Sequence, residues 1–277
     1  MKIWHPQIYG LSGGPLTFMT YFDEIARNEG VEFVSNFYNA NVVLGLNDWI
    51  PVDTVKKARK MKISYVHRVD GLFRPILKGF PDWEKRNERL SLNYREADFV
   101  IFQSRFSRDS YFDFFGTCKE SRVIYNGVDI NKFHPSKRNE MPSKVGLLGR
   151  ELTHKQAEWR RQILEDCPFP VVELQGYKDS VEALKDIRVA ILPDEQNNCP
   201  NQVLECMAMG IPVVVWKHTG AAELVLSSLA VDPSNGLARL LKIWEEDKKY
   251  SKEVRTQVVE DFDIQNTVKE YLQVMEQ

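Results

Sequence analysis

Short apolar runs alternate with longer amphipathic segments along most of this 277-residue chain. Runs such as 42–46 (VVLGL) and 213–216 (VVVW) predict strands that are buried on both faces. Segments such as 16–28 instead place Leu, Met, Phe and Ile at helical spacing. The expected strands are 2–5, 32–37, 42–46, 63–66, 99–103, 123–125, 144–148, 171–175, 189–192, 213–216 and 229–231. The expected helices are 16–28, 53–60, 83–96, 104–115, 155–167, 201–209, 237–250, 253–259 and 267–275. This alternation is typical of α/β domains with parallel sheets.

A polar stretch near the middle of the chain separates two such patterns. The dipeptide Asn126-Gly127 is a strong turn signal, and the following residues 136–144 (SKRNEMPSK) are polar and contain a proline. We therefore expect a domain boundary at 138/139. It gives an N-terminal α/β domain of residues 1–138 and a C-terminal α/β domain of residues 139–263, followed by a last helix within 264–277.

The most informative stretch is 191–216, which reads ILPDEQNNCPNQVLECMAMGIPVVVW. An apolar strand ends at Pro193, a polar loop follows, and a helix begins at Asn201 and stops at Gly210. The N-terminus of a helix suits phosphate or sugar oxygens, because its first N–H groups are unpaired and carry partial positive charge. Glu205 lies one turn inside this helix, where its carboxylate could accept two hydroxyls of a ribose. An ordinary strand–helix–strand crossover with a solvated Glu205 explains the same residues.

Two further segments carry candidate ligand-binding groups next to predicted strands. Gly13 and Gly14 follow the first strand and open a helix, where the backbone could approach a ligand closely, although a plain tight turn is the alternative. Arg150 and Lys155 follow the first strand of the second half. Two fixed cations there could stabilise a departing diphosphate without a metal ion, but they could also be ordinary surface cations.

The end of the strand 63–66 presents a third group of polar residues. His67 ends this strand, Arg68 follows it, and Asp70 stands three residues after the histidine. The carboxyl ends of strands are where open α/β sheets place ligand groups, and Asp70 could bind sugar or acceptor hydroxyls. A histidine that is capped by local backbone is the competing interpretation.

The composition places limits on the class of protein. Hydrophobic residues make up 43% and charged residues 27%, and the net charge is −2, so the sequence has no strong signal for nucleic-acid or membrane binding. The four cysteines have no C-x-x-C spacing, so no zinc site is expected and a reduced, cytoplasmic protein is the default. The run 56–62 (KKARKMK) is either a solvated helix face or a weak contact for an anionic surface. The single Asp-x-Asp, at 261–263, is expected to cap the last helix rather than to bind a metal.

The run 197–215 (NNCPNQVLECMAMGIPVVV) resembles the donor-site signature of family 4 of the retaining GT-B glycosyltransferases, the glycosyl transferases group 1. The run 126–135 (NGVDINKFHP) is similar to the segment that leaves the first domain in that family. Glu205 matches the second of two acidic residues in the signature, whereas the first falls on Asn197, which carries no charge.

The resemblance implies a GT-B fold, with two Rossmann-like domains that have parallel sheets and face each other across a cleft. The helix in 264–277 would pack back on the first domain. The resemblance assigns catalytic positions to His67, Arg150, Lys155 and Asn197. It assigns donor binding to Gly13, Gly14, Asn198, Asn201, Glu205 and Tyr177, of which Tyr177 would stack on the base. It leaves Arg68 and Asp70 on the acceptor side.

The expected function is therefore retaining transfer of a sugar from a nucleotide-diphosphate sugar to an acceptor hydroxyl, with no metal or other cofactor. The partners are a nucleotide sugar and an acceptor that the sequence does not identify. If Asn197 is a sugar ligand, its replacement by Glu should be tolerated. Asn197 also favours an alternative, a nucleotide-sugar-binding protein that has lost transfer. A transferase that acts on modified nucleic acid is a third interpretation, supported only by the basic run 56–62.

Overall fold

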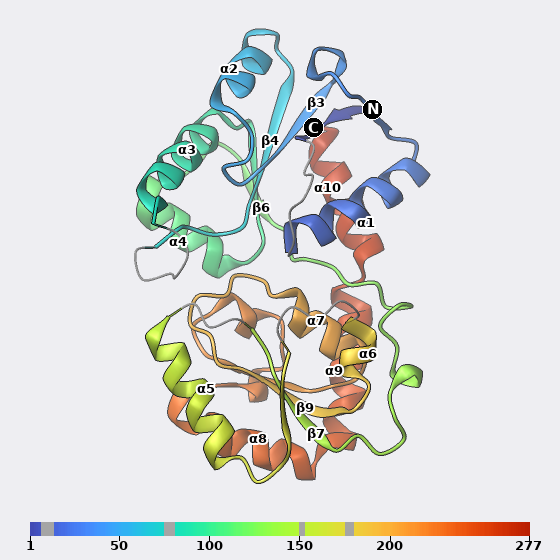
Figure 1. Cartoon of the computed structure of the whole chain (residues 1–277). Coiled ribbons are helices and arrows are strands. Elements are labelled where there is room, and N and C mark those ends of the chain that lie inside the picture. Colours follow the sequence, from blue (N-terminus) through green and yellow to red (C-terminus); the bar gives the residue numbers. More distant parts are fainter. Residues whose placement is uncertain (7–13, 75–80, 150–152, 175–179) are drawn as a thin grey trace. The chain divides into compact units, whose positions relative to one another are not determined.

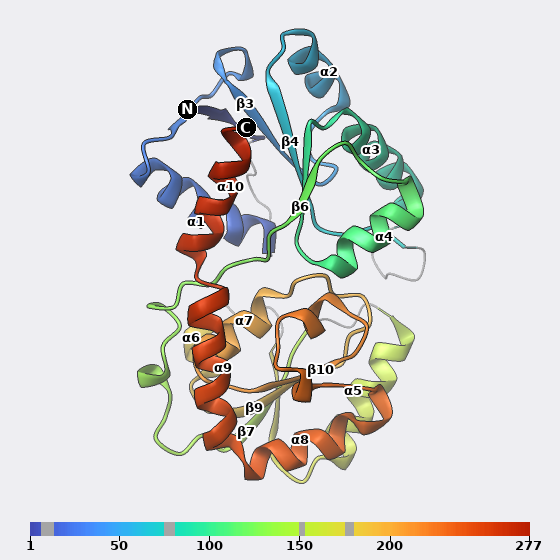
Figure 2. The same cartoon turned by 180° about the vertical axis from the view of Figure 1, so that it is seen from behind.

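The computed structural model describes residues 1–6, 14–74, 81–149, 153–174 and 180–277. The chain forms two compact units (Figures 1 and 2). Unit 1 consists of Met1–Asn126 together with Gln265–Gln277, and unit 2 consists of Gly127–Ile264. Each unit is built on a sheet whose neighbouring strands are all parallel in the described residues, so the predicted α/β class with parallel sheets is confirmed.

The sheet of unit 1 has the strand order β2-β1-β3-β4-β5-β6. Its described strands are β1 (Lys2–Trp4), β2 (Glu32–Phe33), β3 (Val42–Leu46), β4 (Ser64–Val69), β5 (Phe99–Phe102) and β6 (Ser121–Val123). The described α-helices of this unit are α1 (Gly14–Asn28), α2 (Val52–Lys60), α3 (Trp83–Glu96), α4 (Arg105–Phe115) and α10 (Ile264–Met275). Every residue of β3 is buried, which is why this strand reads as a continuous apolar run in the sequence.

The last helix of the chain belongs to unit 1. In both views α10 lies beside α1 (Figures 1 and 2). The ring of Tyr271 packs 4.8 Å from that of Phe18 and 6.0 Å from that of Phe22, measured between ring centroids. The Thr267 hydroxyl donates to the carbonyl of Tyr125 at 3.4 Å, at the point where the chain leaves the unit. Aromatic burial of this kind holds a C-terminal helix on a domain that begins more than 200 residues earlier.

The sheet of unit 2 has the strand order β11-β10-β9-β7-β8. Its described strands are β7 (Lys144–Leu147), β8 (Val171–Glu173), β9 (Ile187–Leu192), β10 (Val213–Trp216) and β11 (Ala230–Val231). The described α-helices are α5 (His154–Asp166), α6 (Ser180–Leu184), α7 (Asn201–Ala208), α8 (Gly236–Glu245) and α9 (Asp247–Asp261). Short 3₁₀ turns lie at 37–39, 135–137, 220–223, 227–229 and 233–235.

The division between the units lies before the boundary expected from the sequence. Residues 127–138 were assigned to the first domain at the sequence level, and the structure places them in unit 2. Arg255 of α9 explains this difference, because its guanidinium donates to the carbonyls of Ile130, Phe133 and Ala208 at 2.6 to 3.1 Å. Arg138 likewise donates to two carbonyls of the same unit. These bonds attach the polar segment to unit 2.

A few elements differ from the sequence expectations. The last strand of unit 1 is 121–123 rather than 123–125. The break between α8 and α9 lies at Glu246, whereas the sequence predicted it between 250 and 253. Neither a proline nor a glycine marks the observed break, so the sequence carries no local signal for it. The short helix α6 was not expected, and α10 begins at Ile264 rather than Thr267.

Candidate functional site

In unit 2 the loops that follow β7, β9 and β10 meet at the carboxyl edge of the sheet. The N–H of Gly149, after β7, donates to the side chain of Gln202 at 2.9 Å. The Gln202 amide also donates to the carbonyl of Leu174, at the end of β8, at 2.9 Å. Gln202 stands in the first turn of α7, so it fixes the N-terminus of this helix against two strand ends.

The loop after β9 is organised around the buried carboxylate of Asp194, which is 4% exposed. One carboxylate oxygen accepts from Gln156 Nε2 at 2.6 Å and from the N–H of Gln196 at 2.8 Å, and the other accepts from Asn197 Nδ2. Burial raises the pKa of Asp194, and these hydrogen bonds oppose the rise. The Asp194 carboxylate therefore accepts its hydrogen bonds from groups of the protein itself, and one of these donors is the side-chain amide of Asn197.

The same loop passes directly over Gly220, at the start of the turn after β10. The N–H of Gly220 donates to the carbonyl of Asn197 at 2.9 Å. A Cβ atom at Gly220 would lie 1.7 Å from the carbonyl oxygen of Asn198. Only glycine fits here, and the loop carrying Asn197 and Asn198 is held in place by this contact.

Helix α7 begins directly after this loop. Pro200 is its N-cap residue and provides no side-chain cap, while the N–H of Val203 donates to the carbonyl of Pro200 at 3.1 Å. Asn201 and Glu205 stand one turn apart on this helix, and both are partly exposed. Both residues were expected from the sequence to bind the donor, and the structure places them on one side of α7.

Lys155 lies in the first turn of α5, between Thr153 and Gln156, the two residues of the capping box. Its ammonium group is 3.1 Å from Glu195 Oε2 and 4.9 Å from the centre of the Trp159 ring. The side chain is 58% exposed, so it remains accessible beside the loop after β9. The predicted site residues Gly13, Arg150 and Tyr177 lie outside the described residues.

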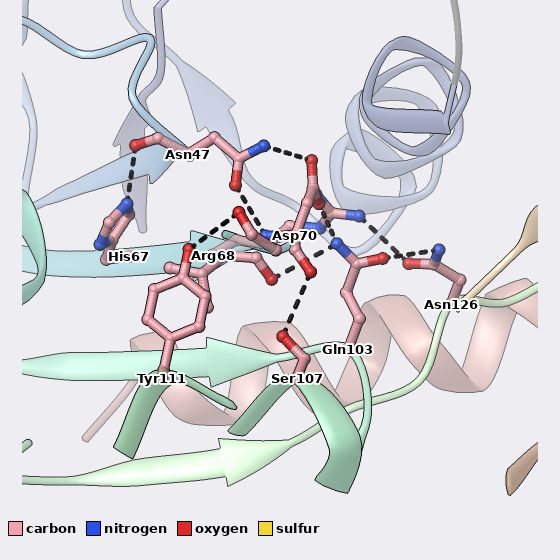
Figure 3. A network of polar contacts seen from close by, with 10 residues as sticks. Asn47, His67, Arg68, Asp70, Gln103, Ser107, Tyr111 and Asn126 are labelled. Carbon is pink, nitrogen blue, oxygen red and sulfur yellow. Dashed lines mark hydrogen bonds and ion pairs between the residues drawn. The ribbon is translucent and has the colours of Figure 1, made fainter. Parts of the chain in front are cut away.

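In unit 1 the carboxyl ends of β3, β4 and β5 share a network of polar side chains (Figure 3). Asn47, after β3, is its centre and has a left-handed backbone with φ of +46°, which Asn tolerates better than most residues. Its side chain donates to Asp70 Oδ2 at 2.6 Å and accepts from the N–H of Asp70 at 2.7 Å. Its carbonyl is 2.8 Å from Nε2 of His67.

His67 lies inside the protein rather than at a ligand surface, since none of its surface is exposed. Because the carbonyl of Asn47 can only accept, Nε2 carries the proton. Burial lowers the pKa of His67 to about 4, so the imidazole is neutral at pH 7. In this structure His67 therefore acts on the site through Asn47 and not by direct contact.

Arg68 and Asp70 form an ion pair within the same network. Arg68 is 1% exposed, donates to Asn126 Oδ1 at 3.1 Å and has its guanidinium 4.4 Å from the centre of the Phe18 ring. Gln103 donates to the Asp70 carboxylate and accepts from Asn126 Nδ2 at 3.0 Å. Burial raises the pKa of Asp70 and the Arg68 guanidinium opposes the rise. The side chain of Asp70 is 23% exposed, so of this ion pair it is the member that a ligand can reach.

A second buried carboxylate stands next to this network. Asp48, 2% exposed at its side chain, accepts from Arg86 at 2.8 and 2.9 Å and from Arg89 at 2.8 Å. Burial raises the pKa of Asp48, but the hydrogen bonds from the two arginines outweigh it and the net shift is downward. The Arg86 guanidinium also lies 3.9 Å from the centre of the Phe73 ring.

The remaining expectations concern the helix starts and the surface. Gly14 is the first residue of α1 and is partly exposed. In the basic run 56–62 the four lysines are exposed, whereas Arg59 is bound to Asp98. Among the described residues no three His, Cys, Asp or Glu side chains are grouped so as to hold a metal ion. None of the described helices combines the length and the apolar character that a membrane span requires.

Asn47, Asp48, Gln103 and Asn126 were not expected at the site from the sequence. A signal for them exists, because Asn47-Asp48 directly follows the buried run 42–46 and Gln103 directly follows 99–102. Polar residues at the carboxyl ends of parallel strands meet at one edge of the sheet. These four residues therefore occupy the same kind of position as His67, directly after or near the end of a buried strand.

Residues 130–243, which run from the beginning of unit 2 into α8, match the family model described as Glycosyl transferases group 1. Comparison with curated protein sequences finds no match. Among solved structures, sucrose-phosphate synthase from Thermosynechococcus elongatus is similar over 99% of this chain and 98% of its own, with 13% identity and a TM-score of 0.82. Alr3699/HepE from Anabaena in complex with UDP-glucose is similar over 100% and 99%, with 15% identity and a TM-score of 0.73. A glycosyltransferase from Rickettsia africae is similar over 99% and 97%, with 12% identity and a TM-score of 0.63.

These comparisons confirm that the chain has the GT-B fold. They also confirm the resemblance to glycosyl transferases group 1 that the sequence predicted, because the matched range contains the loop and helix of the donor-site signature. Residues 130–243 are thus similar to glycosyl transferases group 1. At 12% to 15% identity the solved structures establish the fold alone.

Proposed function

We propose that this chain transfers a sugar from a nucleotide-diphosphate sugar to an acceptor hydroxyl, with retention of the anomeric configuration and without a metal ion. The observation that carries this proposal is the family match over residues 130–243. The matched range includes Lys155, the loop around Asn197, and α7 with Glu205. In several structures of similar fold the bound molecule is UDP or UDP-glucose, which supports a nucleotide sugar as the partner here.

Unit 2 supplies the groups that this donor requires. The N-terminus of α7 suits an anionic or hydroxyl-rich group, since the helix dipole places partial positive charge there and the N-cap residue Pro200 provides no capping side chain. We assign the ribose hydroxyls to Glu205 and the sugar hydroxyls to the loop side chains Asn197 and Asn198. We assign Asn201, the first residue of α7, to the diphosphate.

The proposed chemistry places most demand on the leaving group. The bond between the anomeric carbon and the diphosphate oxygen breaks, and the bond to the acceptor oxygen forms on the same face of the sugar. The acceptor proton passes to the leaving diphosphate, so no protein nucleophile is required. Lys155 provides an accessible cation for the developing negative charge, and Arg150 is the second cation assigned to this task. Unit 1 is assigned to the acceptor, for which Asp70 offers an accessible carboxylate, while Gly13 and Gly14 are assigned to the diphosphate.

The test begins with a thermal-shift panel of UDP-, GDP- and ADP-sugars, since a donor that binds the folded state raises the melting temperature. Donor hydrolysis is then measured without acceptor for the nucleotide sugar that gives the largest shift. Replacing Glu205 by Ala should weaken donor binding about 10- to 100-fold, as expected for hydrogen bonds to a charged group. Glu165→Ala, an exposed change on α5, is the matched control and should bind as the wild type does. Equal affinity in the two variants would remove Glu205 from the donor site.

A binding protein without transfer activity is the second candidate, and Asn197 in place of an acidic residue favours it. Donor binding without any hydrolysis, for every nucleotide sugar of the panel that binds, would support this candidate. A third candidate, a transferase that acts on modified nucleic acid, is supported only by the exposed lysines of 56–62. Retention on DNA that falls steeply with salt would support it.

A further inference from the structure

A pocket of about 320 Å³ opens in unit 1 between the ends of β1 and β2 and one face of α1. Its walls include Trp4 and His5 from the end of β1, Thr20, Asp23 and Arg27 from α1, and Phe33 from β2. These residues are distinct from the network of Asn47, Asp70 and Gln103. None of them has a part in the donor site proposed for unit 2.

The polar side of the pocket is formed by one histidine and one carboxylate. His5 Nε2 lies 3.1 Å from Asp23 Oδ1, and the side chains are 15% and 32% exposed. The other ring nitrogen of His5 is 3.1 Å from the carbonyl of Pro6. His5 is thus fixed between two oxygens and orients the Asp23 carboxylate, which keeps part of its surface open to a ligand.

The remaining walls are aromatic and cationic. The indole N–H of Trp4 donates to the carbonyl of Ser35 at 3.3 Å, and the Trp4 ring packs edge-on against Phe37. The Arg27 guanidinium lies 4.8 Å from the centre of the Phe33 ring. The indole N–H of Trp4 is therefore bonded within the protein, and the Trp4 ring contributes apolar surface to the pocket.

We propose that this pocket binds an uncharged sugar ring, which belongs to the acceptor. This inference rests on the proposed function and names the class of its acceptor as a glycan. Oδ1 of Asp23 is buried against His5, so Oδ2 is the oxygen that can accept from a sugar hydroxyl. The Arg27 guanidinium can donate to another hydroxyl, and aromatic rings pack against the C–H groups of a sugar. The volume lies at the small end of the range for ligand pockets, which suits one or two sugar rings. A phosphate group fits less well, because the Asp23 carboxylate would repel it.

The test uses saturation-transfer NMR on the full chain with methyl glycosides of glucose, galactose, mannose and N-acetylglucosamine. At least one glycoside should bind to the wild type, and Asp23→Asn should weaken that binding at least fivefold. Glu24→Gln is the matched control, because Glu24 is the next residue of α1, is exposed and does not line the pocket, and its affinity should stay within twofold. Arg27→Gln, at an exposed position, provides a second variant should Asp23→Asn fail to fold.

The outcomes separate this inference from the proposed function. If no glycoside binds, or if binding is unchanged in both Asp23→Asn and Arg27→Gln, the inference is overturned even when donor hydrolysis is normal. Inorganic phosphate that binds more tightly than every glycoside, in an Arg27-dependent way, also overturns it. If Asp23-dependent glycoside binding occurs but no nucleotide sugar binds, the pocket stands and the proposed function fails.

Discussion

Replacing Gly220 by Ala should disable the donor loop with little effect elsewhere. The added Cβ would lie 1.7 Å from the carbonyl oxygen of Asn198, 2.4 Å from its carbonyl carbon and 2.7 Å from its Cα. All three atoms belong to the backbone, so no side-chain rotation can relieve the overlap. An ordinary contact is about 3.5 Å. The loop that carries Asn197 and Asn198 must therefore move by more than about 1.5 Å.

A displacement of about 1 Å can cost about 100-fold in rate when a group must be held in a reactive geometry. We therefore expect Gly220→Ala to reduce donor turnover about 100-fold, measured as release of nucleoside diphosphate from the nucleotide sugar selected by thermal shift. Gly30→Ala is the control, because Gly30 has φ of +84° and nothing within 4 Å of an added Cβ. It should lower stability through backbone strain while leaving turnover unchanged.

The turnover of Gly220→Ala relative to Gly30→Ala tests whether the loop after β9 positions the donor. Should Gly220→Ala retain more than half of the wild-type turnover, the loop after β9 does not position the donor. Equal losses in both variants would indicate that turnover follows general stability rather than the placement of the loop.

Three further predictions concern stability. Asn47→Ala removes two hydrogen bonds to Asp70 and places alanine at φ of +46°, so the free energy of unfolding measured in urea should fall by about 2–4 kcal/mol; a loss below about 0.5 kcal/mol would contradict its central role. The folded pKa of His67, about 4, is below its ordinary value of 6.5, so the unfolded state binds more protons between these pH values and stability is lost as pH falls through this window. The loss should amount to about 3 kcal/mol and should be absent in His67→Gln but present in His154→Gln, an exposed control. Arg255→Met leaves the carbonyls of Ile130, Phe133 and Ala208 without their shared donor and should lower stability by about 2–4 kcal/mol, whereas unchanged urea unfolding would show that residues 127–138 are held by other contacts.

The alternation of strands and helices could be predicted because parallel strands that are covered on both faces must be apolar throughout. The strands 42–46 and 213–216 meet this condition completely, and the structure reproduces both as expected. The break at Glu246 could not be predicted, since no proline, glycine or capping side chain marks it. Local rules fail where a helix ends through packing rather than through its own sequence.

The candidate site was predicted only in part for a similar reason. The loop and helix of 197–208 form one local unit, so their spacing in the sequence already determines which residues share a face. The network of unit 1 instead joins Asn47, Arg68 and Asn126, which are 21 to 79 residues apart in the sequence and come together only through strand order. His67 was expected at the site because it ends a strand, but β4 is buried on both faces from Tyr65 to Val69, so the histidine side chain lies in the interior.

Asn197 is the residue for which the structure most changes the expectation from the sequence. A glutamate at this position would restore the acidic residue of the family signature and was expected to be tolerated. In the structure, however, Asn197 Nδ2 donates to Asp194 Oδ2, and Asp194 is 4% exposed. A carboxylate at position 197 would remove this donor and place two anions side by side in a buried setting. Asn197→Glu should therefore lower stability by about 3 kcal/mol and reduce donor binding.

The compensating change follows from the individual atoms of Asp194. Oδ1 accepts from Gln156 and from the N–H of Gln196, whereas Oδ2 accepts only from Asn197 among the bonds described. Asp194→Asn can keep its oxygen in the first position and present its amide to a carboxylate at 197. The double variant Asp194→Asn/Asn197→Glu should then recover about 2 kcal/mol relative to the sum of the single changes, measured by urea unfolding in a double-mutant cycle. If the losses are additive, the hydrogen bond from Asn197 to Asp194 does not explain why position 197 carries an uncharged residue instead of the acidic residue of the signature.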